Sequence, residues 1–109
     1  MILYNLTVRI EHDIEEEWLE YIRNQYVVSV MQTTLFLDFK IYRLLNEPDK
    51  EGLTYALQFF SPSLENIERY LSAFARRITE DHLIRFKNKH VAFNTILESV
   101  LSRDKSEFI

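Results

Sequence analysis

Four runs of alternating side chains, separated by two runs of helical periodicity, constrain this chain more than any other feature. In chain order they predict strand, helix, strand, strand, helix, strand. The predicted strands are Leu3–Glu11, Phe36–Asn46, Leu53–Ser61 and His90–Leu101. A short segment with Pro48 and the only glycine, Gly52, separates the second strand from the third, which predicts an antiparallel hairpin. Two strand-helix-strand halves joined by a hairpin predict an α+β fold of the ferredoxin-like plan, with a four-stranded antiparallel sheet and both helices on one face.

The two helical runs begin with different signals. Asp13 and, three residues later, Glu16 predict an N-cap with a capping box, so the first helix is expected to begin near Asp13. β-Branched residues after Gln25 predict a break or a second short turn before Thr33. Ser61-Pro62-Ser63 predicts a hydroxyl cap for the second helix, which is expected to reach about Phe86. The predicted buried stripes are Ile14, Trp18, Tyr21, Ile22 and Val28 in the first helix, and Ile67, Tyr70, Leu71, Phe74, Ile78 and Leu83 in the second.

Length and composition limit the class of protein. The 109 residues, 47% hydrophobic and 28% charged, fit one folded domain, predicted at 1–101 with a tail at 102–109. The chain has no cysteine, which excludes disulfides, thiolate zinc sites and a cysteine nucleophile. A net charge of −4 and scattered basic residues argue against binding to nucleic acid or anionic lipid. No long apolar run and no signal-like start are present, so we expect a cytoplasmic protein without a membrane span.

The two faces of the predicted sheet differ in polarity. The side chains expected to face the helices are Leu6, Val8, Phe39, Ile41, Tyr55, Leu57, Phe59, Val91 and Phe93. The side chains expected on the uncovered face are Asn5, Thr7, Arg9, Asp38, Lys40, Tyr42, Thr54, Ala56, Gln58, Phe60, His90, Ala92, Asn94 and Ile96. This second set is neither clearly apolar nor clearly polar, and any function is expected there.

Three interpretations of the uncovered face are open. In the first, it is a solvated sheet face, as antiparallel sheets commonly have. In the second, it packs against its copy in a homodimer around a polar-lined cavity. In the third, it binds RNA, but the stacking aromatics of an RNA-recognition motif are absent from the middle of the strands, and only Phe60 stands at a strand end. We favour the homodimer, whose predicted ligand-binding residues are Asn5, Arg9, Lys40, Tyr42, Gln58, His90 and Asn94. The small-molecule ligand is not identified, and no cofactor is predicted.

Several short segments carry a resemblance to a known family. They are Tyr4-Asn5-Leu6-Thr7-Val8, Val30-Met31-Gln32-Thr33 leading to Phe36, Tyr42-Arg43-Leu44-Leu45, Thr54-Tyr55-Ala56-Leu57-Gln58-Phe59, Glu68-Arg69-Tyr70, His82 to Arg85-Phe86, and Val91-Ala92-Phe93. The chain resembles a small uncharacterised family of proteins of about this length, with a domain of unknown function. More distantly it is similar to the dimeric α/β-barrel superfamily, which includes cofactor-independent and haem-degrading monooxygenases. The resemblance implies dimerisation.

The same resemblance implies a rival function. Haem-degrading relatives use an Asn on the first strand, a His on the second helix and a Trp nearby, and Asn5 and His82 stand at the matching elements. Trp18 instead belongs to the apolar stripe of the first helix, and acidic neighbours predict a solvent-exposed His82. The three histidines lack metal-ligand spacing, so no metal site is predicted. The favoured function is a non-enzymatic binding or structural module, and an oxygenase-type enzyme is the alternative.

Overall fold

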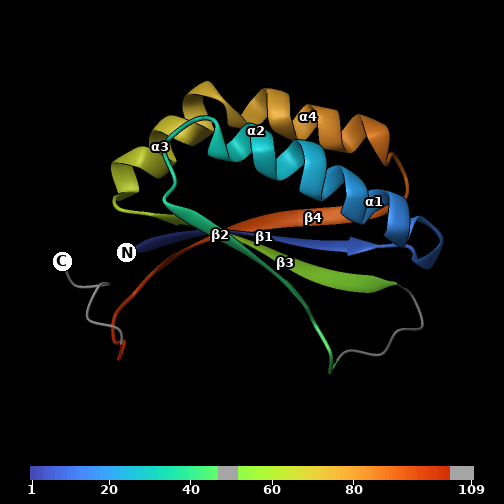
Figure 1. Ribbon diagram of the computed structural model, residues 1–109, viewed down its shortest axis with the longest axis horizontal. Coiled ribbons are helices and arrows are strands. Elements are labelled where there is room, and N and C mark those ends of the chain that lie inside the picture. The colour runs from blue at the N-terminus through green and yellow to red at the C-terminus, as the bar shows by residue number, and fades with distance from the viewer. Residues whose placement is uncertain (47–51, 104–109) are drawn as a thin grey trace.

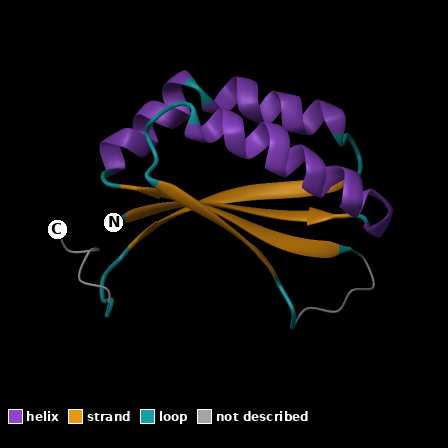
Figure 2. Ribbon diagram, in the orientation of Figure 1, coloured by secondary structure: helices purple, strands orange, loops and turns teal. Residues whose placement is uncertain are grey.

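The protein, described here from a computed structural model of residues 1–46 and 52–103, has one sheet with helices over one of its faces (Figures 1 and 2). In chain order the elements are β1 (Ile2–Ile10), the 3₁₀ turn η1 (His12–Ile14), α1 (Glu15–Tyr21), the π-helical segment η2 (Ile22–Tyr26), α2 (Val27–Met31), β2 (Asp38–Arg43), β3 (Leu53–Ser61), α3 (Leu64–Ala73), α4 (Ala75–Arg85) and β4 (His90–Glu98). The strand order is β2-β3-β1-β4, and every neighbouring pair is antiparallel. This arrangement confirms the predicted α+β ferredoxin-like fold.

The central strands β1 and β3 bury every second side chain against the helices. The buried side chains are Tyr4, Leu6, Val8 and Ile10 on β1, and Leu53, Tyr55, Leu57 and Phe59 on β3. The helices complete the core in two runs that lie side by side over the sheet. The first run, from η1 to α2, contributes Trp18, Tyr26 and Val30, and the second run, α3 and α4, contributes Ile67, Tyr70 and Ile78. Burying one large apolar side chain contributes roughly 1.5–3 kcal/mol, so the facing of these two strands is strongly determined.

The first helical run, from η1 to α2, differs from the prediction in its cap, its continuity and one buried residue. α1 begins at Glu15 with Ile14 at the N-cap, and no side chain caps it. The predicted capping box is wrong because the Asp13 carboxylate accepts a hydrogen bond from Lys89 Nζ at 3.1 Å instead. The predicted break is also absent, since the π-helical segment η2 connects α1 to α2 without interruption. Val28, predicted to be buried, is exposed.

The second helical run, α3 and α4, has the predicted start and a break that was not predicted. The Ser63 Oγ accepts a hydrogen bond from the Asn66 backbone N–H at 3.2 Å, which confirms the hydroxyl cap. At Phe74 the backbone leaves helical geometry (φ −127°, ψ −35°), which divides the run into α3 and α4. Leu71 and Leu83 were assigned wrongly to the buried stripe, because both are exposed.

The register of β4 reverses one prediction. In the pairing of β1 with β4, Val8 lies opposite Ala92 and Leu6 lies opposite Asn94. Opposite residues of an antiparallel pair share a face, so His90, Ala92, Asn94 and Ile96 lie on the helix side, and Val91, Phe93, Thr95 and Leu97 lie on the other. The predicted assignment of β4 to the two faces was therefore wrong. The reason is physical: β4 is an edge strand whose residues are nearly all exposed, so no burial pattern marks its faces.

The remaining strand boundaries agree closely with the predictions. β3 matches its predicted range, and β1 is displaced by one residue. β2 is shorter than predicted at both ends, and β4 ends at Glu98 rather than Leu101. Residues 47–51 of the predicted turn and 104–109 of the predicted tail lie outside the described residues. Among the helices that are described, none has the length and apolar character to cross a membrane.

Candidate functional site

The sheet face turned away from the helices is the first candidate site, and we call it the open face (Figure 2). It comprises Leu3, Asn5, Thr7 and Arg9 on β1, Asp38, Lys40 and Tyr42 on β2, Thr54, Ala56, Gln58 and Phe60 on β3, and Val91, Phe93, Thr95 and Leu97 on β4. Val91 is 69% exposed and Phe93 is 63% exposed. The corrected register of β4 thus makes this face more apolar than the sequence had predicted.

Five of the seven predicted ligand-binding residues share the open face. Gln58 lies opposite Asn5 on one side and opposite Lys40 on the other, so these three form a polar row across the sheet. Asn5 Nδ2 donates a hydrogen bond to Thr7 Oγ1 at 3.0 Å, and Lys40 Nζ lies 5.6 Å from the centre of the Phe60 ring. The other members of this group are Arg9 and Tyr42. His90 and Asn94 do not join them, because both lie on the helix side.

The predicted catalytic pair does not converge. Asn5 belongs to the open face, whereas His82 is buried between the helices and the sheet. His82 is only 3% exposed, so the prediction of a solvent-exposed ring was wrong. Trp18, which the sequence separated from this pair, instead contacts His82 directly: its Nε1 donates a hydrogen bond to His82 Nε2 at 2.9 Å.

His82 is the centre of an aromatic cluster on the helix side. Its ring stacks on Tyr21 with a centre-to-centre distance of 5.8 Å, and its centre lies 4.5 Å from that of His90. Burial first, and then the neighbouring His90, lower the pKa of His82 to about 4, while Asp81 acts in the opposite direction. His82 is therefore an uncharged imidazole at neutral pH.

Asp81, the neighbour of His82, is held by groups on two helices. Tyr21 Oη donates a hydrogen bond to Asp81 Oδ2 at 2.8 Å, and Arg85 Nε donates to both carboxylate oxygens at 3.2 Å. These contacts, the Tyr21 hydrogen bond first, lower the pKa of Asp81. The ion pair between Asp81 and Arg85 lies within α4 and is half exposed, so it stabilises the fold little. The hydrogen bond from Tyr21 is the contact that joins α1 to α4 here.

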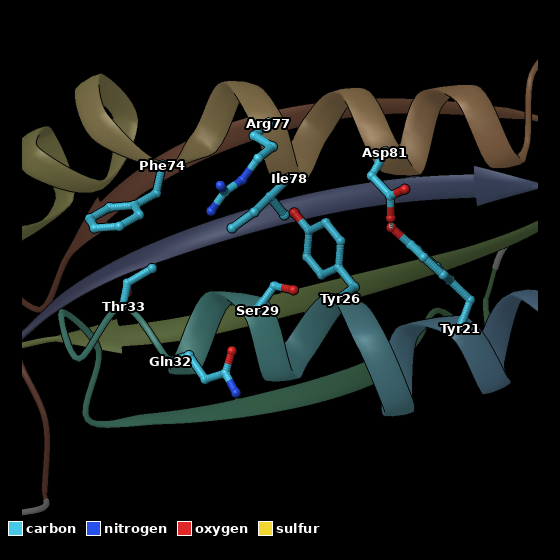
Figure 3. Close-up of a pocket in the computed structure, with 9 residues that line it drawn as sticks. All are labelled: Tyr21, Tyr26, Ser29, Gln32, Thr33, Phe74, Arg77, Ile78 and Asp81. Atoms are coloured by element: carbon cyan, nitrogen blue, oxygen red, sulfur yellow. Dashed lines mark hydrogen bonds between the residues drawn. The ribbon is translucent and has the colours of Figure 1, made fainter.

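Two of the cavities on the helix side lie next to the aromatic cluster around His82. The first, of about 430 Å³, lies in the groove between the two helical runs, where Arg77 reaches from α4 toward Ser29 and Gln32 near α2 (Figure 3). The second, of about 270 Å³, is lined by Leu6, Tyr26, Thr79, His82, Leu83, His90, Val91 and Ala92. Sequence reasoning missed both, because each is lined by residues far apart in the chain. Over the described residues, no group of three or more His, Cys, Asp or Glu side chains is placed to hold a metal ion.

A comparison with family models gives the relationship of the chain. The model for DUF4286, a domain of unknown function, matches residues 1–100. The chain belongs to the DUF4286 family. Among curated proteins, none matches the sequence.

Solved structures support the fold of this DUF4286 domain. It is similar to a dimeric ferredoxin-like protein from an uncultured marine organism, with a TM-score of 0.73 and 12% identity over 93% of this chain and 96% of that one. It is also similar to SnoaB, a cofactor-independent oxygenase from Streptomyces nogalater, with a TM-score of 0.65 and 12% identity over 95% and 98% of the two chains. A candidate antibiotic biosynthesis monooxygenase from Nitrosomonas europaea gives 0.66 and 11% over 93% and 100%. At these identities the likeness extends to the fold alone.

Proposed function

We propose that this DUF4286 domain is a binding or structural module that acts as a homodimer, with the open faces of two copies packed against each other. The observation that carries the proposal is the exposed apolar surface of β4 on that face, where Val91 and Phe93 have most of their area in water. An exposed apolar patch rimmed by polar groups is typical of a protein interaction site. The ferredoxin-like protein of similar fold is described as dimeric, which supports dimerisation.

A second copy suits the open face better than solvent or a highly charged partner. The face carries charges of both signs: Asp38 and Lys40 are neighbours on β2, and Arg9 lies at the other end of the sheet on β1. Two copies therefore meet without a uniform like-charge repulsion. A symmetric dimer also uses the same surface twice, which makes it the simplest way to cover one apolar face. In this dimer the polar row of Asn5, Gln58 and Lys40 lies between the sheets, where it supplies hydrogen-bonding groups to a small ligand.

The oxygenase alternative has support from the fold alone. Its predicted pair, Asn5 and His82, lies on opposite sides of the sheet. The Trp18 contact uses Nε2 of His82 for a structural hydrogen bond. An oxygenase in this chain would need a different set of residues.

Sedimentation velocity at micromolar concentration tests the homodimer. The test variant is Phe93→Asp, which introduces a charge on the open face. The matched control is Ile84→Asp, because Ile84 is 73% exposed on α4, on the other side of the molecule. We expect a dimer for the native chain and for Ile84→Asp, and a monomer for Phe93→Asp. A monomeric native chain, or a Phe93→Asp variant as dimeric as the control, overturns the proposal.

A further inference from the structure

The smaller helix-side cavity is built between α4 and the start of β4. Its size of about 270 Å³ is just below the range of drug-sized ligand sites, which suits a molecule with a single ring. Ala92 faces this side of β4, while the bulkier Phe93 faces the other. The small side chain leaves room beneath α4 that a phenyl group in the same orientation would occupy.

The hydrogen bonds around the cavity determine which nitrogen of each imidazole carries the proton. The indole of Trp18 is only a donor, so His82 Nε2 accepts and the proton of the neutral ring is on Nδ1. The Phe86 carbonyl oxygen is only an acceptor and lies 2.8 Å from His90 Nδ1, so His90 donates from that atom. Neutral His90 therefore has its lone pair on Nε2.

One donor and one acceptor are thus left without a protein partner among the residues that the structure describes. The donor is His82 Nδ1–H and the acceptor is His90 Nε2, and both rings line the cavity with their centres 4.5 Å apart. Neither atom is among the fully buried side-chain atoms that lack a partner, so each keeps some access to the solvent in the cavity. A ligand with an acceptor and a donor in matching positions can therefore replace water at both atoms.

The rest of the lining selects against charge. Leu6, Leu83 and Ala92 are apolar, Tyr26 and Thr79 carry uncharged hydroxyls, and no Lys, Arg, Asp or Glu among the described residues lines the cavity. An ion placed there would lose its hydration without gaining an opposite charge. Leu83, which is 54% exposed, lies at the same cavity, so an apolar molecule meets an apolar side chain at the entrance.

We propose that the cavity between α4 and β4 binds a small uncharged molecule with a hydroxyl group on an apolar body. A hydroxyl both accepts and donates, so one oxygen accepts from His82 Nδ1–H and donates to His90 Nε2. A carbonyl satisfies only the first group, and a hydrocarbon satisfies neither. Apart from Val91, the strand residues that line the cavity, Leu6, His90 and Ala92, lie on the helix side of the sheet, so binding there does not require the homodimer.

A pair of fluorinated probes tests the site by ¹⁹F NMR. The probes are 4-fluorobenzyl alcohol and 4-fluorotoluene, which differ in the hydroxyl group. Both are titrated into the full chain and into His90→Phe, which removes the acceptor but keeps an aromatic ring. We expect the native chain to bind the alcohol, and its preference for the alcohol over the toluene to fall about tenfold in His90→Phe.

Two further variants place the binding in the cavity. Ala92→Trp fills the cavity and is expected to abolish binding of both probes. Ala73→Trp is the control, because Ala73 is an exposed alanine at the end of α3 and lines none of the cavities described above. No binding to the native chain, an unchanged preference in His90→Phe, or unchanged binding in Ala92→Trp would each overturn the proposal. Since none of these variants changes a side chain of the open face, the outcome is separate from that of the dimer test.

Discussion

Acidification is expected to destabilise this protein through one buried side chain, His82. The ring is 3% exposed, and its pKa is lowered from the usual 6.5 to about 4, first by burial and then by His90. Between these values the unfolded chain binds a proton that the folded chain does not bind. The free energy of unfolding therefore rises with pH across this window. The contribution is complete above pH 6.5 and is lost as the pH falls toward 4.

The magnitude follows from the two pKa values. Their difference corresponds to about 3 kcal/mol of stability, since one pKa unit is worth about 1.4 kcal/mol. This pKa already includes the negative charge of Asp81, which favours the protonated ring. For a domain whose total stability is about 5–15 kcal/mol, this is a large share.

Urea unfolding at a series of pH values measures the effect. The variant His82→Gln keeps an oxygen that can accept from Trp18 but cannot titrate, and His12→Gln removes an exposed histidine as the control. Far-UV circular dichroism follows unfolding at one fixed protein concentration. From pH 6.5 to 4, we expect the native chain and His12→Gln to lose about 3 kcal/mol more than His82→Gln. A difference between native and His82→Gln that stays constant across the window refutes the argument, because carboxylates contribute equally to all three chains.

Two further predictions concern the chain near β3 and the haem hypothesis. Gly52 has a φ of +149°, and a Cβ there would collide with the Ile10 carbonyl oxygen. Gly52→Ala should therefore lower the free energy of unfolding by about 1–3 kcal/mol, while the control Asn46→Ala should leave it unchanged. Equal urea midpoints for the two variants would contradict this prediction. Haem titration should give no Soret shift that His82→Ala abolishes, because the ring is buried with its Nε2 bonded to Trp18. A His82-dependent shift would restore the oxygenase alternative.

Much of the fold could be predicted because local signals agreed with the final structure. β3 was predicted over its full range, since its alternate residues are apolar and become buried. The Ser63 cap is a contact within one turn, so the sequence contains all of it. The Asp13 cap failed for the opposite reason: Lys89, distant in sequence, takes the carboxylate. No local pattern can anticipate such a competitor.

The candidate sites were less accessible to sequence reasoning. The pairing of Asn5 with His82 placed two residues at plausible elements but could not place them on the same side of the sheet. Trp18 and His82 are 64 positions apart, and their hydrogen bond exists only because α1 and α4 cover the same face. Trp18 was correctly assigned to the apolar stripe, yet its role as a donor to a buried imidazole has no sequence signal.

The sequence by itself determined the order of the elements and which face of β1 and β3 meets the helices. The two faces of these strands differ in polarity, and only one orientation buries the apolar side chains. Tertiary structure alone decided the facing of β4. That strand lies at the edge, with apolar side chains on both faces and little burial on either, so only its register against β1 determines which face meets the helices. This register places Phe93 on the open face and His90 at the helix-side cavity, and both proposals depend on it.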